Sequence, residues 1–252
     1  MYWFLCRHNS LFRSVSLIFG KYSFSVKNID LIISNLYKDT PTPKYYIEVG
    51  ANDGISQSNT KYLELYDSWS GTLIEPVPEL YIKLLRNRSK SNSFTNAACC
   101  SFENSKPYFK LQYGNLRTIS LDGDNDIENP LLHATNNTRL TSKIEETYQF
   151  LAPAKTLNSI LLENNAPKLI NFFSLDVEGS ELEVLNGIDF NEFFFELICI
   201  ESRSFKRIES FLIEKGYIYV SKLNNNVTYS DYLFRNQNFA INLCSINNHT
   251  KK

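Results

Sequence analysis

Four apolar runs of strand length constrain the fold of this chain more than any other feature of its sequence. They lie at residues 45–49, 71–75, 169–175 and 197–201, and segments with the apolar spacing of helices separate them. Strands that are apolar almost throughout are typical of a parallel sheet with helices on both faces. The pattern therefore predicts an α/β fold, in which ligands bind at the carboxyl ends of the strands.

The remaining segments extend this arrangement. We expect helices at residues 29–37, 61–66, 78–87, 156–164, 181–186 and 205–215, and further strands at 93–100, 107–113, 217–221 and 232–234. Residues 114–153 are polar, rich in asparagine and without a clear period, so we interpret them as an irregular surface insertion. The predicted domain covers residues 41–245, between a basic and aromatic helical segment at 1–40 and a polar tail at 246–252.

Composition and charge exclude several classes of protein. The chain has 252 residues, of which 43% are hydrophobic and 21% charged, as in an ordinary globular domain without extensive disorder. Its 26 lysines and arginines nearly balance its 27 aspartates and glutamates, so no overall positive field attracts nucleic acid. We therefore expect no nucleic-acid partner.

The five cysteines include no C-x-x-C pair, so they fit neither a disulfide framework nor a zinc site. Cys99 and Cys199 lie inside apolar runs and are expected to be buried as small hydrophobic residues. This usage predicts a reducing compartment, which for this chain we take to be the cytoplasm. No apolar run approaches the roughly 18 residues that a membrane-spanning helix needs.

Residues 1–27 contain no acidic side chain, and Arg7, Arg13, Lys21 and Lys27 stand among aromatic and aliphatic residues. Such a segment is a transit-type presequence, an amphipathic helix lying on a membrane surface, or a helix packed against the domain. The apolar stretch at 15–19 is too short for the core of a secretory signal. The three interpretations stay open, and the second would give the protein peripheral membrane contact through residues 1–27.

Acidic side chains follow the first two strands. The first strand leads into Glu48, Gly50 and Asp53, a loop unlike the glycine-rich fingerprint that binds a pyrophosphate. Glu75 ends the second strand, about 20 residues further on, where an α/β nucleoside site places its ribose-binding acid. Acids beside the ligand repel phosphate and suit a cation, so the two loops predict S-adenosylmethionine, which combines a ribose with a sulfonium. The alternative for either loop alone is a tight turn with solvated acids.

The fourth strand ends in a second acidic segment. Asp176 and Glu178 flank its end and could hold the amino acid part of the ligand or take a proton from an acceptor hydroxyl. They could also bind a hard divalent cation through oxygen. We predict no metal site, because no further ligand is evident from the sequence.

Four motifs carry a family resemblance: Y-I-E-V-G-A-N-D-G at 46–54, L-I-E-P-V-P at 73–78, N-A-A at 96–98 and F-S-L-D-V-E-G-S-E-L-E-V-L-N-G at 173–187. Over about residues 45–234 the chain resembles the FkbM family of S-adenosylmethionine-dependent methyltransferases. The resemblance implies a class I methyltransferase (Rossmann-like) fold, with a mostly parallel seven-stranded sheet, an antiparallel last strand and helices on both faces. It also implies methyl transfer to a hydroxyl, commonly on sugars, glycans or polyketides.

The resemblance also assigns roles to residues of this chain. It implies contacts with the methionine part of the cofactor from Glu48, Gly50, Asn52, Asp53 and Gly54, with the ribose from Glu75, and with the adenine from Asn96 and Ala97. Asp176 and Glu178 would face the methionine end and the acceptor. The implied partner is thus a small-molecule or glycan acceptor.

Methyl transfer to a hydroxyl needs a group that takes its proton. Asp176 and Glu178 are the first candidates, and His133, in the insertion expected to cover the mouth of the site, is the third. Two other functions remain to be weighed. A nicotinamide oxidoreductase is disfavoured because the loop lacks the central glycine that pyrophosphate binding needs. A non-catalytic relative, acting as a membrane-associated or trafficking module, is opposed by the intact set of acids.

Overall fold

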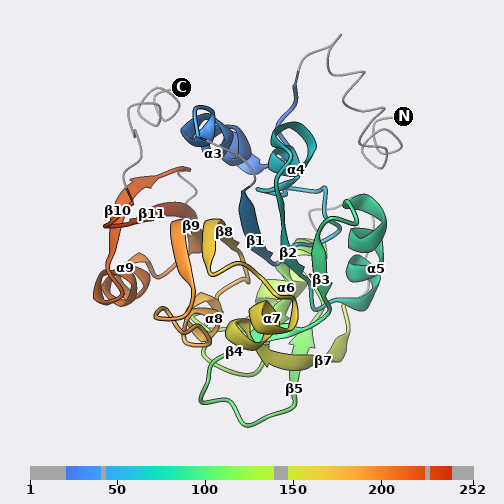
Figure 1. Cartoon of the computed structure of the whole chain (residues 1–252). Coiled ribbons are helices and arrows are strands. Elements are labelled where there is room, and N and C mark those ends of the chain that lie inside the picture. The colour runs from blue at the N-terminus through green and yellow to red at the C-terminus, as the bar shows by residue number, and fades with distance from the viewer. Residues whose placement is uncertain (1–20, 41–43, 139–146, 225–227, 240–252) are drawn as a thin grey trace.

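The computed structural model describes residues 21–40, 44–138, 147–224 and 228–239, with the side chains of residues 136–138 excepted. A central sheet of seven strands, in the order β10-β11-β9-β8-β1-β2-β3, forms the core of the fold (Figure 1). Six strands of this sheet run in one direction, and only β11 runs in the opposite direction. The strands are β1 (Tyr45–Val49), β2 (Ser70–Ile74), β3 (Ser93–Thr95), β8 (Leu169–Leu175), β9 (Phe194–Ser202), β10 (Tyr217–Lys222) and β11 (Ser230–Asn236). The predicted α/β class and the antiparallel last strand are confirmed.

Consecutive residues of the central strands bury their side chains on opposite faces of the sheet, as strand geometry requires. Tyr46 and Phe172 pack with helices α3 (Ile29–Tyr37), α4 (Lys61–Asp67) and α5 (Pro78–Asn87) on one face. Ile47 and Phe173 pack with α7 (Leu157–Glu163), α8 (Glu181–Leu185) and α9 (Phe205–Glu214) on the other. A short 3-10 helix, η1 (Val26–Asn28), precedes α3. The predicted helices are thus present, with ends that differ by up to one residue.

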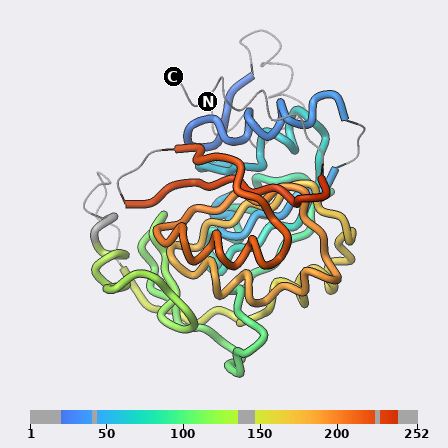
Figure 2. Tube along the Cα trace, turned by 90° about the vertical axis from the view of Figure 1, so that its left-hand side faces the viewer, coloured from blue at the N-terminus to red at the C-terminus, as the bar shows by residue number. Residues whose placement is uncertain are grey.

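The predicted irregular insertion at 114–153 is wrong in part, because it contains regular structure. A second sheet has the order β4-β7-β5-β6, with α6 (Pro130–Thr138) and the 3-10 helix η2 (Asn115–Arg117) beside it. Its strands are β4 (Ala98–Cys100), β5 (Tyr108–Gln112), β6 (Ile119–Ser120) and β7 (Gln149–Thr156). Figure 2 shows the green part of the chain gathered at one end of the molecule, away from α3 in blue. Pairing between β5 and β7, which lie far apart in sequence, produces this order rather than a local period.

The strand predicted at 93–100 is also two strands. β3 pairs with β2 in the central sheet, whereas β4 pairs with β7 in the second sheet. Asn96 and Ala97 lie at the change of sheet, and the Asn96 amide donates to the backbone oxygens of Glu75 and Pro76, at 2.7 and 3.0 Å. This break turns the chain across the carboxyl ends of the central strands.

Three further expectations from the sequence concern the cysteines, the two ends of the chain and membrane-spanning helices. Cys99 and Cys199 are buried and free, as predicted. Most of the basic and aromatic segment at 1–27, and the tail at 246–252, lie outside the described residues. None of the helices described is long and apolar enough to cross a bilayer.

Candidate functional site

A cavity of about 230 Å³ opens at the carboxyl ends of the central strands. Its wall consists of the loops that follow β1, β2 and β8, the end of β9, the break at Ala97 and the 3-10 helix η2. The chain therefore places its cavity where parallel α/β sheets bind their ligands.

The loop after β1 is held close to the end of β8. Gly50 adopts a φ of +86°, and a Cβ at this position would lie 1.9 Å from the backbone oxygen of Asp176. The amides of Gly50 and Ala51 both donate to the backbone oxygen of Ile74, at 3.1 and 3.0 Å. Only glycine satisfies both the backbone conformation and the space at position 50.

Replacing Gly50 with alanine is expected to weaken the binding of S-adenosylhomocysteine about tenfold or more, because the loop must move away from Asp176. Calorimetric titration measures this loss. The matched control is Gly216→Ala, which has a similar φ of +83° but no contact closer than 3.4 Å and no place in the cavity wall. Equal loss in both variants would show that backbone strain alone, and not the approach to Asp176, is responsible.

Glu75 lies at the end of β2 and is buried, with 5% of its surface exposed. One carboxylate oxygen accepts the amide of Asn52 at 2.8 Å, and the other accepts the amide of Val77 at 2.9 Å. Burial, which outweighs these hydrogen bonds, raises the pKa of Glu75 to about 7. Each oxygen keeps a lone pair for a further donor such as a hydroxyl.

The raised pKa of Glu75 predicts a pH-dependent affinity for S-adenosylhomocysteine. If Glu75 binds the ribose, as the resemblance implies, the ribose hydroxyls would donate to the ionised carboxylate. Affinity should then rise with pH and level off above about pH 7, and binding at pH 6 should be up to about tenfold weaker. Proton release at pH 6, counted by calorimetry in two buffers of different ionisation enthalpy, checks this. Glu75→Gln should bind weakly at every pH. A pH-independent affinity in the unsubstituted protein would contradict the assignment of Glu75 to the ribose.

Glu48 lines the cavity, but both of its carboxylate oxygens accept hydrogen bonds from other residues of the protein. They accept from the hydroxyls of Ser58 and Thr60, from the amide of Asn59, and from Arg88 at 3.3 Å. Glu48 therefore shapes the loop at residues 50–60, which forms one wall of the cavity. A direct contact with the cofactor, as the sequence motif implies, would have to share these oxygens.

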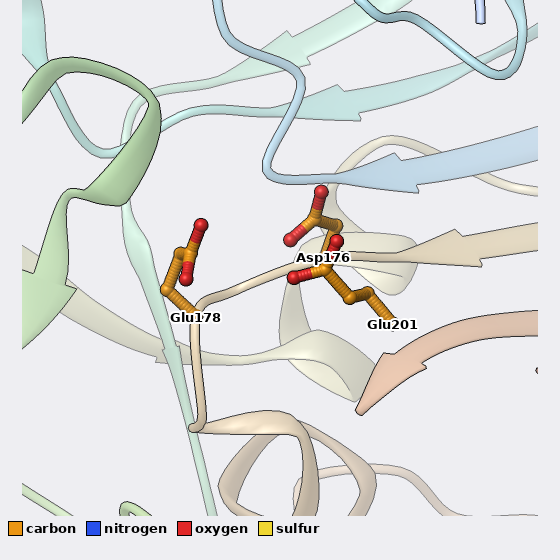
Figure 3. Close-up of side chains that lie close together, drawn as sticks. All are labelled: Asp176, Glu178 and Glu201. Atoms are coloured by element: carbon orange, nitrogen blue, oxygen red, sulfur yellow. The ribbon is translucent and has the colours of Figure 1, made fainter. Parts of the chain in front are cut away.

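The opposite wall carries three carboxylates, on Asp176, Glu178 and Glu201 (Figure 3). One oxygen from each lies within 4.8 Å of the others. Parallel pairing explains the approach, since Leu175 of β8 is in register with Ile200 of β9 and the next residues are Asp176 and Glu201. Asp176 is open to the cavity, whereas Glu201 is 9% exposed.

Two side chains, His133 and Arg203, hold Glu178. Its Oε2 lies 2.8 Å from Nε2 of His133, on α6, and 2.9 Å from the Arg203 guanidinium, which also lies 5.5 Å from the Tyr229 ring centroid. Glu178 has a φ of 54°, in the left-handed region. The insertion thus reaches the acidic wall through His133.

Burial and mutual repulsion disfavour the ionised forms of Asp176 and Glu201. Surrounding protein atoms first, and the neighbouring carboxylate of Glu178 second, raise the pKa of Asp176. Burial and the charges of Asp176 and Glu178 likewise raise the pKa of Glu201. Among the described residues, the side chains of Asp176 and Glu201 accept no hydrogen bond.

The structure separates the predicted site residues into two groups. Glu48, Gly50, Asn52, Glu75, Ala97, Asp176 and Glu178 all line one cavity. Asp53, Gly54, Asn96 and His133 are not among the described residues of its wall. Asp53 instead accepts the amides of Ile55 and Ser56, at 2.9 and 2.7 Å, and Gly54 would meet Leu84 and Arg88 if it carried a Cβ. Asp53 and Gly54 thus contact the protein on the side of the loop away from the cavity.

Sequence reasoning missed three residues of this region: Glu201, Arg203 and Arg88. Glu201 is the last residue of a predicted strand and Arg203 comes shortly after it, close to where Asp176 follows its own strand, so the parallel order already contained a signal for them. Arg88 directly follows α5 and carried no such signal, because its partners Glu48 and Glu64 are 40 and 24 residues away.

Comparisons with known proteins agree on one class. The model of the family described as "Methyltransferase FkbM domain" matches residues 48–219. A protein of Beauveria bassiana (strain ARSEF 2860) named "Methyltransferase 1" is 25% identical over 169 residues, which are 64% of this chain and 65% of that protein. The match therefore spans slightly less than two thirds of this relative.

One solved structure to which the chain is similar is a TrmK from M. capricolum in complex with S-adenosylhomocysteine. The two sequences are 13% identical, the match covers 82% of this chain and 67% of that chain, and the TM-score is 0.40. The N-terminal domain of human METTL16 in complex with S-adenosylhomocysteine has 13% identity, with 83% and 69% covered and a TM-score of 0.46.

Proposed function

The chain belongs to the FkbM methyltransferase family, and from this premise we propose that it transfers the methyl group of S-adenosylmethionine to a hydroxyl of a sugar, a glycan or a related small molecule. One observation carries the proposal. Two acid-bearing loops, one with Glu75 and one with Asp176 and Glu178, come from different strands and line the same cavity.

The first loop suits the cofactor. Glu75 would accept from the ribose hydroxyls, Gly50 and Asn52 would lie along the methionine part, and Ala97 would lie against the adenine. Carboxylates across the cavity favour the sulfonium charge, since opposite charges attract strongly where protein walls exclude water. These roles are consistent with a cavity that has no glycine-rich phosphate loop.

The second loop suits the acceptor. Methyl transfer is an in-line displacement in which the acceptor oxygen attacks the methyl carbon, the carbon–sulfur bond breaks, and the sulfonium becomes a neutral thioether. Holding the oxygen about 3 Å from the carbon supplies much of the rate. The hydroxyl proton would pass to the group formed by Asp176, Glu178 and His133, an assistance worth typically 10²- to 10⁴-fold.

The competing function is a non-catalytic, membrane-associated or trafficking module. It would depend on residues 1–27, most of which lie outside the described residues. Glu201 argues against it, because a buried acid that accepts no hydrogen bond among the described residues costs stability that a binding module has no reason to give up.

Calorimetric titration with S-adenosylmethionine and S-adenosylhomocysteine tests the proposal first, on the unsubstituted protein and on Glu75→Ala. We expect micromolar binding that is lost in the variant. Glu79→Ala, an exposed glutamate four residues further along the chain, is the control and should bind normally. A folded protein that binds neither nucleoside would favour the non-catalytic function. Transfer of a labelled methyl group to a panel of glycans then identifies the acceptor class.

A further inference from the structure

We propose that Asp176, Glu178 and Glu201 bind one hard divalent cation, each through a carboxylate oxygen, in the wall of the cavity. The three side chains come from the loop after β8 and from the end of β9, and Figure 3 shows their carboxylates facing one another across a short gap. Hard divalent cations in proteins are bound by oxygen ligands of this kind.

Glu201 supplies the observation that goes beyond a gathering of acids. The residue is nine-tenths buried, and among the described residues its carboxylate accepts no hydrogen bond and has no cationic group within 4 Å. Its carboxylate points at Asp176 (Figure 3). A buried carboxylate is costly unless it is paired or coordinates a metal, so a ligand at this position would remove the cost.

The carboxylates of this region outnumber the cationic side chains that contact them. His133 and Arg203 both contact the same oxygen of Glu178, Oε2, which leaves Oε1 of that carboxylate open. The Arg203 guanidinium compensates one of the three carboxylates. Asp176 and Glu201 remain, and Asp231 of β11, whose side chain bonds Asn224, adds a further negative charge close by. A cation of charge +2 would balance the two unpaired carboxylates.

The spacing fits the size of such a cation. Two oxygens on opposite sides of a bound ion lie at twice the metal–oxygen distance, about 4.2 Å for Mg²⁺ and about 5 Å for Ca²⁺. The three donor oxygens lie within 4.8 Å of one another, so rotations of the side chains that bring them a few tenths of an ångström closer would let all three contact one calcium-sized ion.

The backbone already holds the ligands in position. The amide of Asp176 donates to the backbone oxygen of Val49 at 3.1 Å, and the tight approach of Gly50 fixes the same residue. Glu178 is held by His133 and Arg203. Asp176 is open to the cavity, which gives an ion a path from solvent.

The role of the cation rests on the proposed function, although its binding does not. An acceptor hydroxyl that coordinates the ion beside the methyl group would lose its proton to water more readily, as water bound to catalytic metals does. The carboxylates would then act on the acceptor through the ion and not as direct proton acceptors.

The test is titration of the chelator-treated full chain with Mn²⁺. Calorimetry measures the binding, electron paramagnetic resonance measures the Mn²⁺ that stays free, and Mg²⁺ and Ca²⁺ serve as competitors. We expect one saturable site per chain. Glu201→Gln and Asp176→Asn should each weaken binding about tenfold or more, whereas Glu163→Gln, a half-exposed surface carboxylate, should not. Thermal unfolding gives a second readout, since Mn²⁺ should raise the Tm of the unsubstituted protein and not that of the variants.

Saturable binding that both variants retain, or the absence of saturable binding by the unsubstituted protein, would overturn the inference. Titration of the same samples with S-adenosylhomocysteine separates it from the proposed function. A protein that binds the nucleoside and no cation refutes the cation site alone, whereas one that binds neither refutes both.

Discussion

Replacing Arg88 with methionine is expected to lower the free energy of unfolding by about 3–5 kcal/mol, the cost of removing one partner from a buried ionic group. The Arg88 side chain is fully buried and contacts Glu64 at 2.7 Å and Glu48 at 3.3 Å. It also donates to the hydroxyls of Tyr46 and Thr60, at 2.6 and 2.9 Å. Glu64 keeps Lys61 as a partner at 3.0 Å, so Glu48 is the carboxylate left without a cation. Urea denaturation measures the change.

The control is Arg86→Met, which removes an exposed arginine from the same helix. It should change stability by less than about 0.5 kcal/mol, as is usual for surface substitutions. Because Arg88 and Glu48 shape the loop at residues 50–60, the Arg88 variant should also bind S-adenosylhomocysteine more weakly. Similar losses of stability in the two variants would show that the buried ionic group is not the cause.

The sequence predicted the central sheet because its strands carry their information locally. In β8, five of the seven residues are buried, and Phe172 and Phe173 pack against different sets of helices, so most of the strand is apolar whatever its neighbours are. The loops after β1, β2 and β8 were predicted to meet for the same reason, since the ends of parallel strands share one edge of a sheet. These residues therefore line one cavity as expected.

The second sheet could not be predicted in the same way. β7 contains Pro153 and Lys155 and has mostly half-exposed residues, so it shows neither an apolar run nor a clean alternation. Its position depends on β5, about 40 residues earlier, and on β4. α6 is built partly from asparagine and threonine, which favour helices weakly. Contacts at long sequence separation decide these elements, and a single sequence does not display them.

The proposed cation site was not predicted for a related reason. Asp176 and Glu178 were identified as carboxylates able to bind a cation, and no metal was predicted because a third ligand was lacking. Glu201 lies 23 residues beyond Glu178, within a strand that reads as an ordinary buried element. Only the register between β8 and β9 brings it beside Asp176.

Asp176→Asn is expected to lower the turnover of methyl transfer by about 10²- to 10⁴-fold while the affinity for S-adenosylhomocysteine changes little. The substitution keeps the size of the side chain and removes the carboxylate from the wall that we propose faces the acceptor. Single-turnover transfer of a labelled methyl group measures the rate, and calorimetry measures the affinity. Asp39→Asn, at an exposed site, is the isosteric control and should keep full turnover.

Comparison with Glu178→Gln then shows how the acidic wall works. If Asp176 and Glu178 act as one unit, either by taking the proton or by holding a cation, each single variant should lose most of the rate, and the double variant should lose little more than the worse single one. Losses that simply multiply would mean that the two carboxylates contribute independently. A double variant with full turnover would remove both from the reaction, and the acceptor would have to be activated from the side of the cavity formed by η2.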